Sequence, residues 1–187
     1  MVDLRTRVRD IVRQIQLFPY IWPTPPDATS ARTLRAGSCA SKHALLAEEL
    51  EALGVRSQPM LVIGALVPSV LADDSDIAQG AHLEEVHECL TVMSPWAGPL
   101  RVDVTWDPPL IRRGLAGTLR WDGLTDMLVA VGEGTPAWGV IREDVREAKE
   151  ALRARIYRAG EREIRDRVLR VMTERFASWR STDSFSK

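Results

Sequence analysis

Two strand-like segments in the middle of the chain are joined by a short turn, and this arrangement limits the folds that the chain can adopt. Val86–Met93 alternates along its length, and Leu100–Trp106 reads as the return strand. Between them, Ser94–Pro99 contains two prolines and a glycine, which are typical of turns. A connection of this length favours antiparallel pairing. We therefore expect a β-hairpin at the centre of the fold.

Helical periodicity precedes the hairpin in two segments. Val2–Leu17 places apolar residues at helical spacing with arginines between them, and Ala40–Leu53 carries an apolar stripe. Ser38 stands at the N-cap of the second helix, and Gly54 stands where its C-terminal cap belongs. Four prolines between residues 19 and 26 exclude regular structure there.

The remaining segments complete an α+β pattern. Gln58–Val67 predicts a buried strand, and residues 71–81 predict an exposed loop. Leu124–Val131 allows a short helix. Ile141–Ala159 and Ile164–Trp179 form two helical stripes separated by a glycine, as a helical hairpin or one kinked helix. Helices, then strands, then helices favour the α+β class.

Length and charge indicate one soluble globular domain spanning residues 1–187. The chain has 25 basic and 26 acidic residues, a net charge of −1, and 45% hydrophobic residues. This balance argues against a nucleic-acid or membrane-surface partner. The N-terminal segment lacks the features of an export signal, and the longest apolar run, Met60–Val67, is too short to span a bilayer. We expect a cytoplasmic protein with reduced thiols.

Cys39 lies at the expected start of a helix, where unpaired N–H groups and the helix dipole favour an anion. A thiol in this place should have a lowered pKa and therefore more of the nucleophilic thiolate form. Lys42 follows one turn later as a further cation. The alternative is that Cys39 is a small buried residue that fills a contact between helix and sheet.

His87 and Asp103 lie opposite each other if the hairpin turn is centred near Pro95. A carboxylate in that place can fix the tautomer of an imidazole whose other nitrogen faces a thiol. Asp103 stands between two valines inside a strand, where an unpaired carboxylate is disfavoured. The alternatives are a histidine bonded to the backbone and a surface carboxylate near the turn.

The other rare residues read as bystanders. Two cysteines and three histidines are too few for a redundant zinc site or a disulfide framework, so we expect neither a metal nor a cofactor. His82 reads as a solvated loop histidine, and His43 as a residue that packs or caps. Cys89 reads as a reduced structural thiol, with a redox-regulated bond to Cys39 as the alternative. Asp107 reads as a turn residue, with a supporting role behind the site as the alternative. Trp106 and Trp121 read as core residues, with a place on the wall of a cleft as the alternative.

Three motifs in order resemble the transglutaminase-like superfamily. Gly37–Leu46 followed by Leu53–Val55 is similar to its nucleophile helix, His87–Val92 to its histidine-led strand, and Val102–Pro108 to its Val-Asp-x-Thr-Trp-Asp motif. The resemblance covers residues 35–109. The C-terminal helical extension, residues 140–180, lies outside it.

This resemblance implies a papain-like core, in which a nucleophile helix packs on an antiparallel sheet. It implies a Cys–His–Asp triad, with Cys39 as nucleophile, His87 as general base and then acid, and Asp103 as the orienting carboxylate. Members act on amide bonds through a thioester. The family often has an aromatic residue where this chain has Cys89.

Two hypotheses follow from these residues. The first is a cysteine-dependent hydrolase or acyl transferase that acts on an amide- or peptide-like substrate without a cofactor. Its oxyanion would be stabilised by the Cys39 backbone N–H and by an upstream donor, for which the candidates are Gln16, Tyr20 and Trp22. The second is a catalytically inactive module that uses the same fold to bind a protein or peptide.

Overall fold

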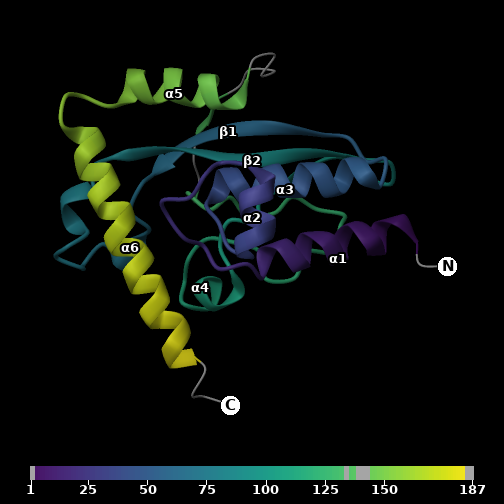
Figure 1. Cartoon of the computed structure of the whole chain (residues 1–187), viewed down its shortest axis with the longest axis horizontal. Helices are drawn as coiled ribbons and strands as arrows, with labels where there is room; N and C mark the ends of the chain where they lie inside the picture. The colour runs from purple at the N-terminus through teal and green to yellow at the C-terminus, as the bar shows by residue number, and fades with distance from the viewer. Residues whose placement is uncertain (1–2, 133–134, 138–143, 184–187) are drawn as a thin grey trace.

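The computed structural model describes residues 3–132, 135–137 and 144–183 (Figure 1). Within these residues, no helix is long and apolar enough to cross a membrane. The helices are α1 (Leu4–Gln16), α2 (Ala28–Leu34), α3 (Cys39–Ala52), α4 (Pro108–Arg112), α5 (Val145–Ile156) and α6 (Glu161–Asp183). The strands are β1 (Ser57–Ala65), β2 (Glu84–Ser94), β3 (Gly98–Val102) and β4 (Thr135–Ala137).

The four strands form one sheet in the order β3-β2-β1-β4, and every neighbouring pair is antiparallel. Helices precede and follow the first three strands along the chain, so the fold is α+β, as the sequence pattern predicts. In Figure 1, α5 lies along one side of the β1–β2 pair, and α1, α2 and α3 lie along the other.

The hairpin forms, but its register differs from the sequence prediction. Leu90 pairs with Val102, which centres the turn on Trp96 and would place Cys89 opposite Asp103. The strand also ends at Val102, four residues before the predicted end. The turn is accommodated by Gly98, whose φ of 78° is a left-handed conformation that favours glycine. The β2–β3 ladder ends at Leu90 and Val102, before it reaches His87, so the predicted direct opposition of His87 and Asp103 is wrong.

Helix α3 begins at Cys39 and ends at Ala52, within one residue of the prediction. Leu45, Leu46 and Leu50 are buried against β2 and β3 in the larger hydrophobic core. Gly54 adopts a φ of 72° just past the helix end, as expected of a C-terminal cap. The apolar stripe of the helix therefore fixes which way its N-terminus faces.

Buried ion pairs attach the C-terminal helices to the rest of the fold. Glu85 of β2 forms ion pairs with Arg153 of α5 and with Arg165 of α6. At the far end of α6, Arg180 donates to Asp107 at 2.6 and 3.0 Å. These contacts hold α5 and α6 against the part of the chain that carries the site motifs.

Several elements differ from the sequence prediction. Helix α2 begins after the N-cap Asp27, and α4 begins at two prolines, which favour a first helical turn; neither was predicted. Residues 124–131 form no helix because this segment instead hydrogen-bonds across to other elements, as at Met127 N–H to the Arg101 carbonyl. The two C-terminal stripes are two separate helices, divided at Gly160. Residues 138–143 lie outside the described residues.

Lys42 is a fully buried cation that ties three segments together. Its ammonium donates to the carbonyls of Phe18 and Thr105 at 2.9 Å, and to that of Gln16 at 3.4 Å. Burial lowers the pKa of Lys42 to about 7, and the nearby carboxylates of Asp107 and Asp103 act in the opposite direction. Lys42 therefore serves the packing of α1 against α3, and it is not the cation that faces Cys39.

Replacement of Lys42 by Met should destabilise the fold by about 1–3 kcal/mol, because three buried carbonyls lose their donor. Urea denaturation followed by circular dichroism measures this loss. Arg32→Met is the matched control, since it removes an exposed cation paired with Glu48 and Glu49, and should cost less than about 1 kcal/mol. Equal stability losses in the two variants would contradict this structural role.

Candidate active site

Cys39 occupies the first turn of α3 on the wall of a cavity of about 620 Å³. Ser38 takes the N-cap position that the sequence predicts, but its side chain makes no capping hydrogen bond. Ser38, Cys39 and Ala40 all line the cavity. The thiol is therefore partly exposed, beside the positive end of a helix.

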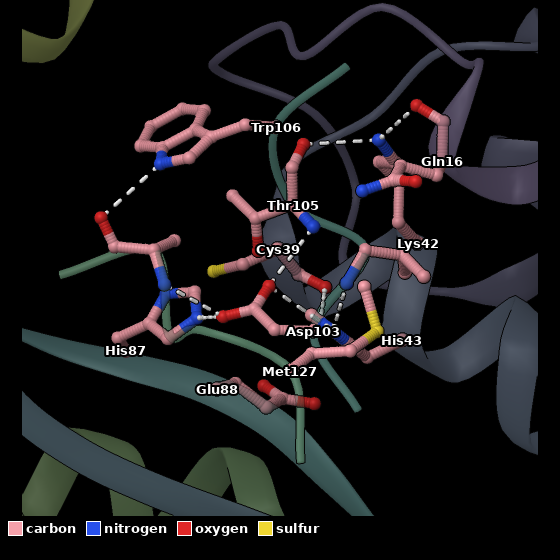
Figure 2. A network of polar contacts seen from close by, with 12 residues as sticks. Gln16, Cys39, Lys42, His43, His87, Glu88, Asp103, Thr105, Trp106 and Met127 are labelled. Carbon is pink, nitrogen blue, oxygen red and sulfur yellow. Dashed lines mark hydrogen bonds and ion pairs between the residues drawn. The ribbon is translucent and has the colours of Figure 1, made fainter. Parts of the chain in front are cut away.

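The structure brings His87 and Asp103 together despite the shifted register (Figure 2). The Nε2 nitrogen of His87 lies 2.7 Å from Oδ2 of Asp103, and both side chains are almost fully buried. Cys39 and His87 line the same cavity, and each shifts the pKa of the other. Because Nε2 is engaged by the carboxylate, Nδ1 is the nitrogen left for the thiol. The three residues thus form a Cys–His–Asp chain.

Asp103 comes directly after β3, and two backbone N–H groups hold its carboxylate. The N–H of Thr105 donates to Oδ1 and the N–H of Ala130 donates to Oδ2, each at 2.9 Å. Burial alone would raise the pKa of Asp103, but the charge and hydrogen bond of His87 lower it well below its usual range. The carboxylate is therefore ionised and fixed in orientation.

The electrostatics of the site favour a thiolate–imidazolium pair. Burial would raise the pKa of the Cys39 thiol, but Lys149 and His87 bring it down to about 7. Burial would lower the pKa of His87, but Asp103 and Cys39 raise it to about 10. Between these two values the proton resides on His87 and the charge on sulfur. Such a pair can add a thiolate to a carbonyl carbon.

His43 is a neutral histidine that locks α3 to the segment carrying Asp103. Its Nε2 accepts from the N–H of Val104 at 3.1 Å, so its Nδ1–H donates to the Cys39 carbonyl at 2.7 Å. Burial lowers the pKa of His43 to about 4, although Asp103 acts in the opposite direction. His43 thus fixes the relative position of the nucleophile helix and the orienting carboxylate, and it is not a rival base.

Stability should fall as the pH drops between about 6.5 and 4, because unfolded His43 gains a proton there that the folded form resists. The loss should be on the order of 2 kcal/mol, measured by urea denaturation across this range. The His43→Gln variant should be less stable, but its free energy of unfolding should change less with pH over the same range. His87 does not obscure the result, since its raised pKa gives stability that is lost only above about pH 6.5. Parallel pH dependences in the two proteins would count against a neutral buried His43.

Lys149 and Glu88 are site residues that the sequence analysis missed. Nζ of Lys149 lies 3.5 Å from Sγ of Cys39 and 3.5 Å from Oε2 of Glu88. The lysine comes from α5, in the extension that no motif covers. One signal could have found it: only three of the 25 basic residues are lysines, and two of these are Lys42 and Lys149.

The structure separates the upstream candidates for an oxyanion donor. Tyr20 and Trp22 line the cavity, whereas Gln16 is not among its lining residues. The Gln16 amide donates to the Thr118 carbonyl at 2.9 Å, so that candidate is wrong. Gln16 is buried because it lies where the end of α1 meets the segment that carries Thr118. Burial, and next the charge of Cys39, raise the pKa of Tyr20 and keep its hydroxyl protonated.

The remaining candidates do not contribute to the thiol chemistry. Cys89 is fully buried with Val62 and Val129, and burial raises the pKa of its thiol. Both cysteines are free. His82 is exposed on its loop. Asp107 accepts from the Tyr20 N–H and Arg180. Trp106 and Trp121 are both buried, and Trp106 also lines the cavity. Among the described residues, no cluster of His, Cys, Asp and Glu could hold a metal ion.

Comparisons with known proteins give little further information. No protein-family model matches the chain, and no curated protein matches it. Among solved structures, the chain is similar to one described as a "Putative Cysteine Protease from Cytophaga hutchinsonii", with a TM-score of 0.42 and 17% identity. The alignment covers 71% of this chain and 37% of that chain, so this chain spans well under half the length of that protein.

Proposed function

We propose that this protein is a cysteine-dependent hydrolase or acyl transferase that acts on an amide- or peptide-like substrate through a thioester. The observation that carries the proposal is that Cys39 lines the same cavity as His87, whose Nε2 is hydrogen-bonded to Asp103 at 2.7 Å. A partly exposed thiol, a raised imidazole pKa and an ionised carboxylate match the parts of a nucleophilic triad.

In the first step, the Cys39 thiolate attacks the substrate carbonyl carbon, and the carbonyl π electrons move onto oxygen. The protonated Nδ1 of His87 then gives its proton to the leaving amine as the carbon–nitrogen bond breaks. The products are a free amine and a thioester on Cys39. Asp103 keeps the imidazolium oriented throughout and stays ionised.

Two groups on the cavity wall are suited to stabilise the tetrahedral oxyanion. One is the backbone N–H of Cys39, in the first turn of α3, where N–H groups lack partners within the helix. The other is the hydroxyl of Tyr20, which lines the same cavity and is kept protonated. The isolated bridge between Tyr20 and Gly37 holds this tyrosine beside the start of the nucleophile helix.

In the second step, His87 acts as the base for the group that resolves the thioester. Neutral Nδ1 removes a proton from water or from an acceptor amine as its oxygen or nitrogen attacks the acyl carbon. The carbon–sulfur bond breaks and the thiolate returns beside the imidazolium. Water gives hydrolysis and an amine gives acyl transfer.

The same observations favour catalysis over a binding module that has lost its activity. A binding module has no need for a thiol and an aspartate-oriented histidine on the wall of one cavity. A cavity plugged by the segment after Pro109 would favour binding alone. Ala130 and Val131 of that segment form part of the cavity wall, and Cys39 stays partly exposed.

Iodoacetamide should alkylate Cys39 at least about tenfold faster than Cys89 at about pH 6, because only the Cys39 thiol has a lowered pKa. Peptide mapping by mass spectrometry separates the two sites. His87→Ala should slow the reaction at Cys39, since it removes one of the cations that favour the thiolate. Slow and equal alkylation of both cysteines would rule out a triad.

Tyr20→Phe should lower acylation of Cys39 by p-nitrophenyl acetate on the order of 100-fold, because one oxyanion donor is lost. Released p-nitrophenolate and acetyl-Cys39 in mass spectra report the rate. Alkylation by iodoacetamide should be unchanged in the same variant, since that displacement at a saturated carbon forms no oxyanion. Cys39→Ser is the control for labelling elsewhere. An equal loss in both reactions would show that Tyr20 acts on the thiol rather than on the oxyanion.

A further inference from the structure

A buried lysine from the C-terminal extension contacts the proposed nucleophile. Lys149 lies on α5, is 6% exposed, and its Nζ is 3.5 Å from the Cys39 sulfur. The chain uses arginine for 22 of its 25 basic residues and lysine for three. Arg153 of α5 and Arg165 of α6 both pair with the single carboxylate of Glu85.

The surroundings of Lys149 favour a cation that serves an anion on sulfur. Its other partner is Glu88 at 3.5 Å, a single buried carboxylate. Glu85 lies further away and is already paired, and Arg153 on the same helix adds positive charge. Burial of an ammonium is costly unless anions compensate it. A thiolate on Cys39 provides the second anion, so the ammonium lies between two negative charges.

We infer that Lys149 is a positioning residue of the Cys39 site, which holds the thiolate in place and in its anionic form before substrate binds. This inference rests on the proposed function, because it assigns a second cation to the same nucleophile. Burial raises the pKa of Cys39, and the charge of Lys149 is the largest single influence that lowers it; His87 acts in the same direction as Lys149, and Glu88 opposes both. The thiolate and Glu88 in turn raise the pKa of Lys149.

This role differs from that of His87. The imidazolium must give up its proton to the leaving amine, so it supports the thiolate only until acylation. Lys149 does not donate a proton to the leaving amine, so it keeps its positive charge through the cycle. The extension therefore completes the site: α5 brings the cation, and the pairing of Glu85 with Arg153 and Arg165 places α5 where the cation reaches the sulfur.

The test is the pH dependence of Cys39 alkylation by iodoacetamide in the intact protein. Lys149→Met should move the midpoint upward by about one pH unit, which makes the reaction about tenfold slower below the midpoint. Lys149→Arg should keep the midpoint near its original value, since the positive charge remains. Arg146→Met is the matched control because Arg146 lines the same cavity from the same helix, and it should move the midpoint little.

Each result decides the inference. An unchanged midpoint in Lys149→Met, or an equal shift in Arg146→Met, overturns it. Circular dichroism and thermal melting identify a variant that does not fold, and Lys149→Gln then gives the same comparison with a polar side chain. The proposed function fails separately: if Cys39→Ser leaves acylation by p-nitrophenyl acetate unchanged while Lys149→Met still shifts the midpoint, Lys149 tunes a thiol that is not a nucleophile in catalysis.

Discussion

The buried carboxylate of Asp103 is the interaction on which the rest of the site depends. It accepts from His87 and from the N–H groups of Thr105 and Ala130, and it lies 3.6 Å from His43. A lone carboxylate in this place would be strongly disfavoured, so the fold must supply donors around it. Those donors come from β2 and from the segment between β3 and β4, while His43 of α3 holds the adjacent Val104 N–H. A single charge thus couples the orientation of His87 to the packing of the elements that carry Cys39.

The sequence indicated this cluster because Cys39, His87 and Asp103 each lie in a local sequence context that suits a role in a triad. A cysteine at a helix start, a histidine in a strand and an aspartate between valines each allow a purely structural role, and only their combination indicates a triad. The predicted geometry was less reliable. The register of a hairpin depends on the turn, and a turn centred on Trp96 rather than Pro95 displaces every pair by two residues. The contact survives because Asp103 lies beyond the end of β3, where the backbone is no longer bound to the ladder.

The contacts that Lys149, Glu88 and Gln16 make could not be derived from the sequence. Each depends on how segments distant in the chain meet: Lys149 is 110 residues from Cys39, and Gln16 is 102 residues from Thr118. Helical periodicity shows which face of α5 is apolar, but Lys149 lies among charged residues that look alike in the sequence. Its significance emerges only when α5 is placed against β2, and that placement is fixed by Glu85 and its two arginines.

The two buried lysines show how one residue type serves two different purposes in this fold. Lys42 satisfies three backbone carbonyls, which are neutral, and burial lowers its pKa to about 7. Lys149 faces a thiol and a carboxylate, and its pKa is raised instead. The opposite directions follow from the charge of the partners, because only anions offset the burial of an ammonium. Burial lowers the pKa of Lys149, and the negative charges of Cys39 and Glu88 outweigh that effect.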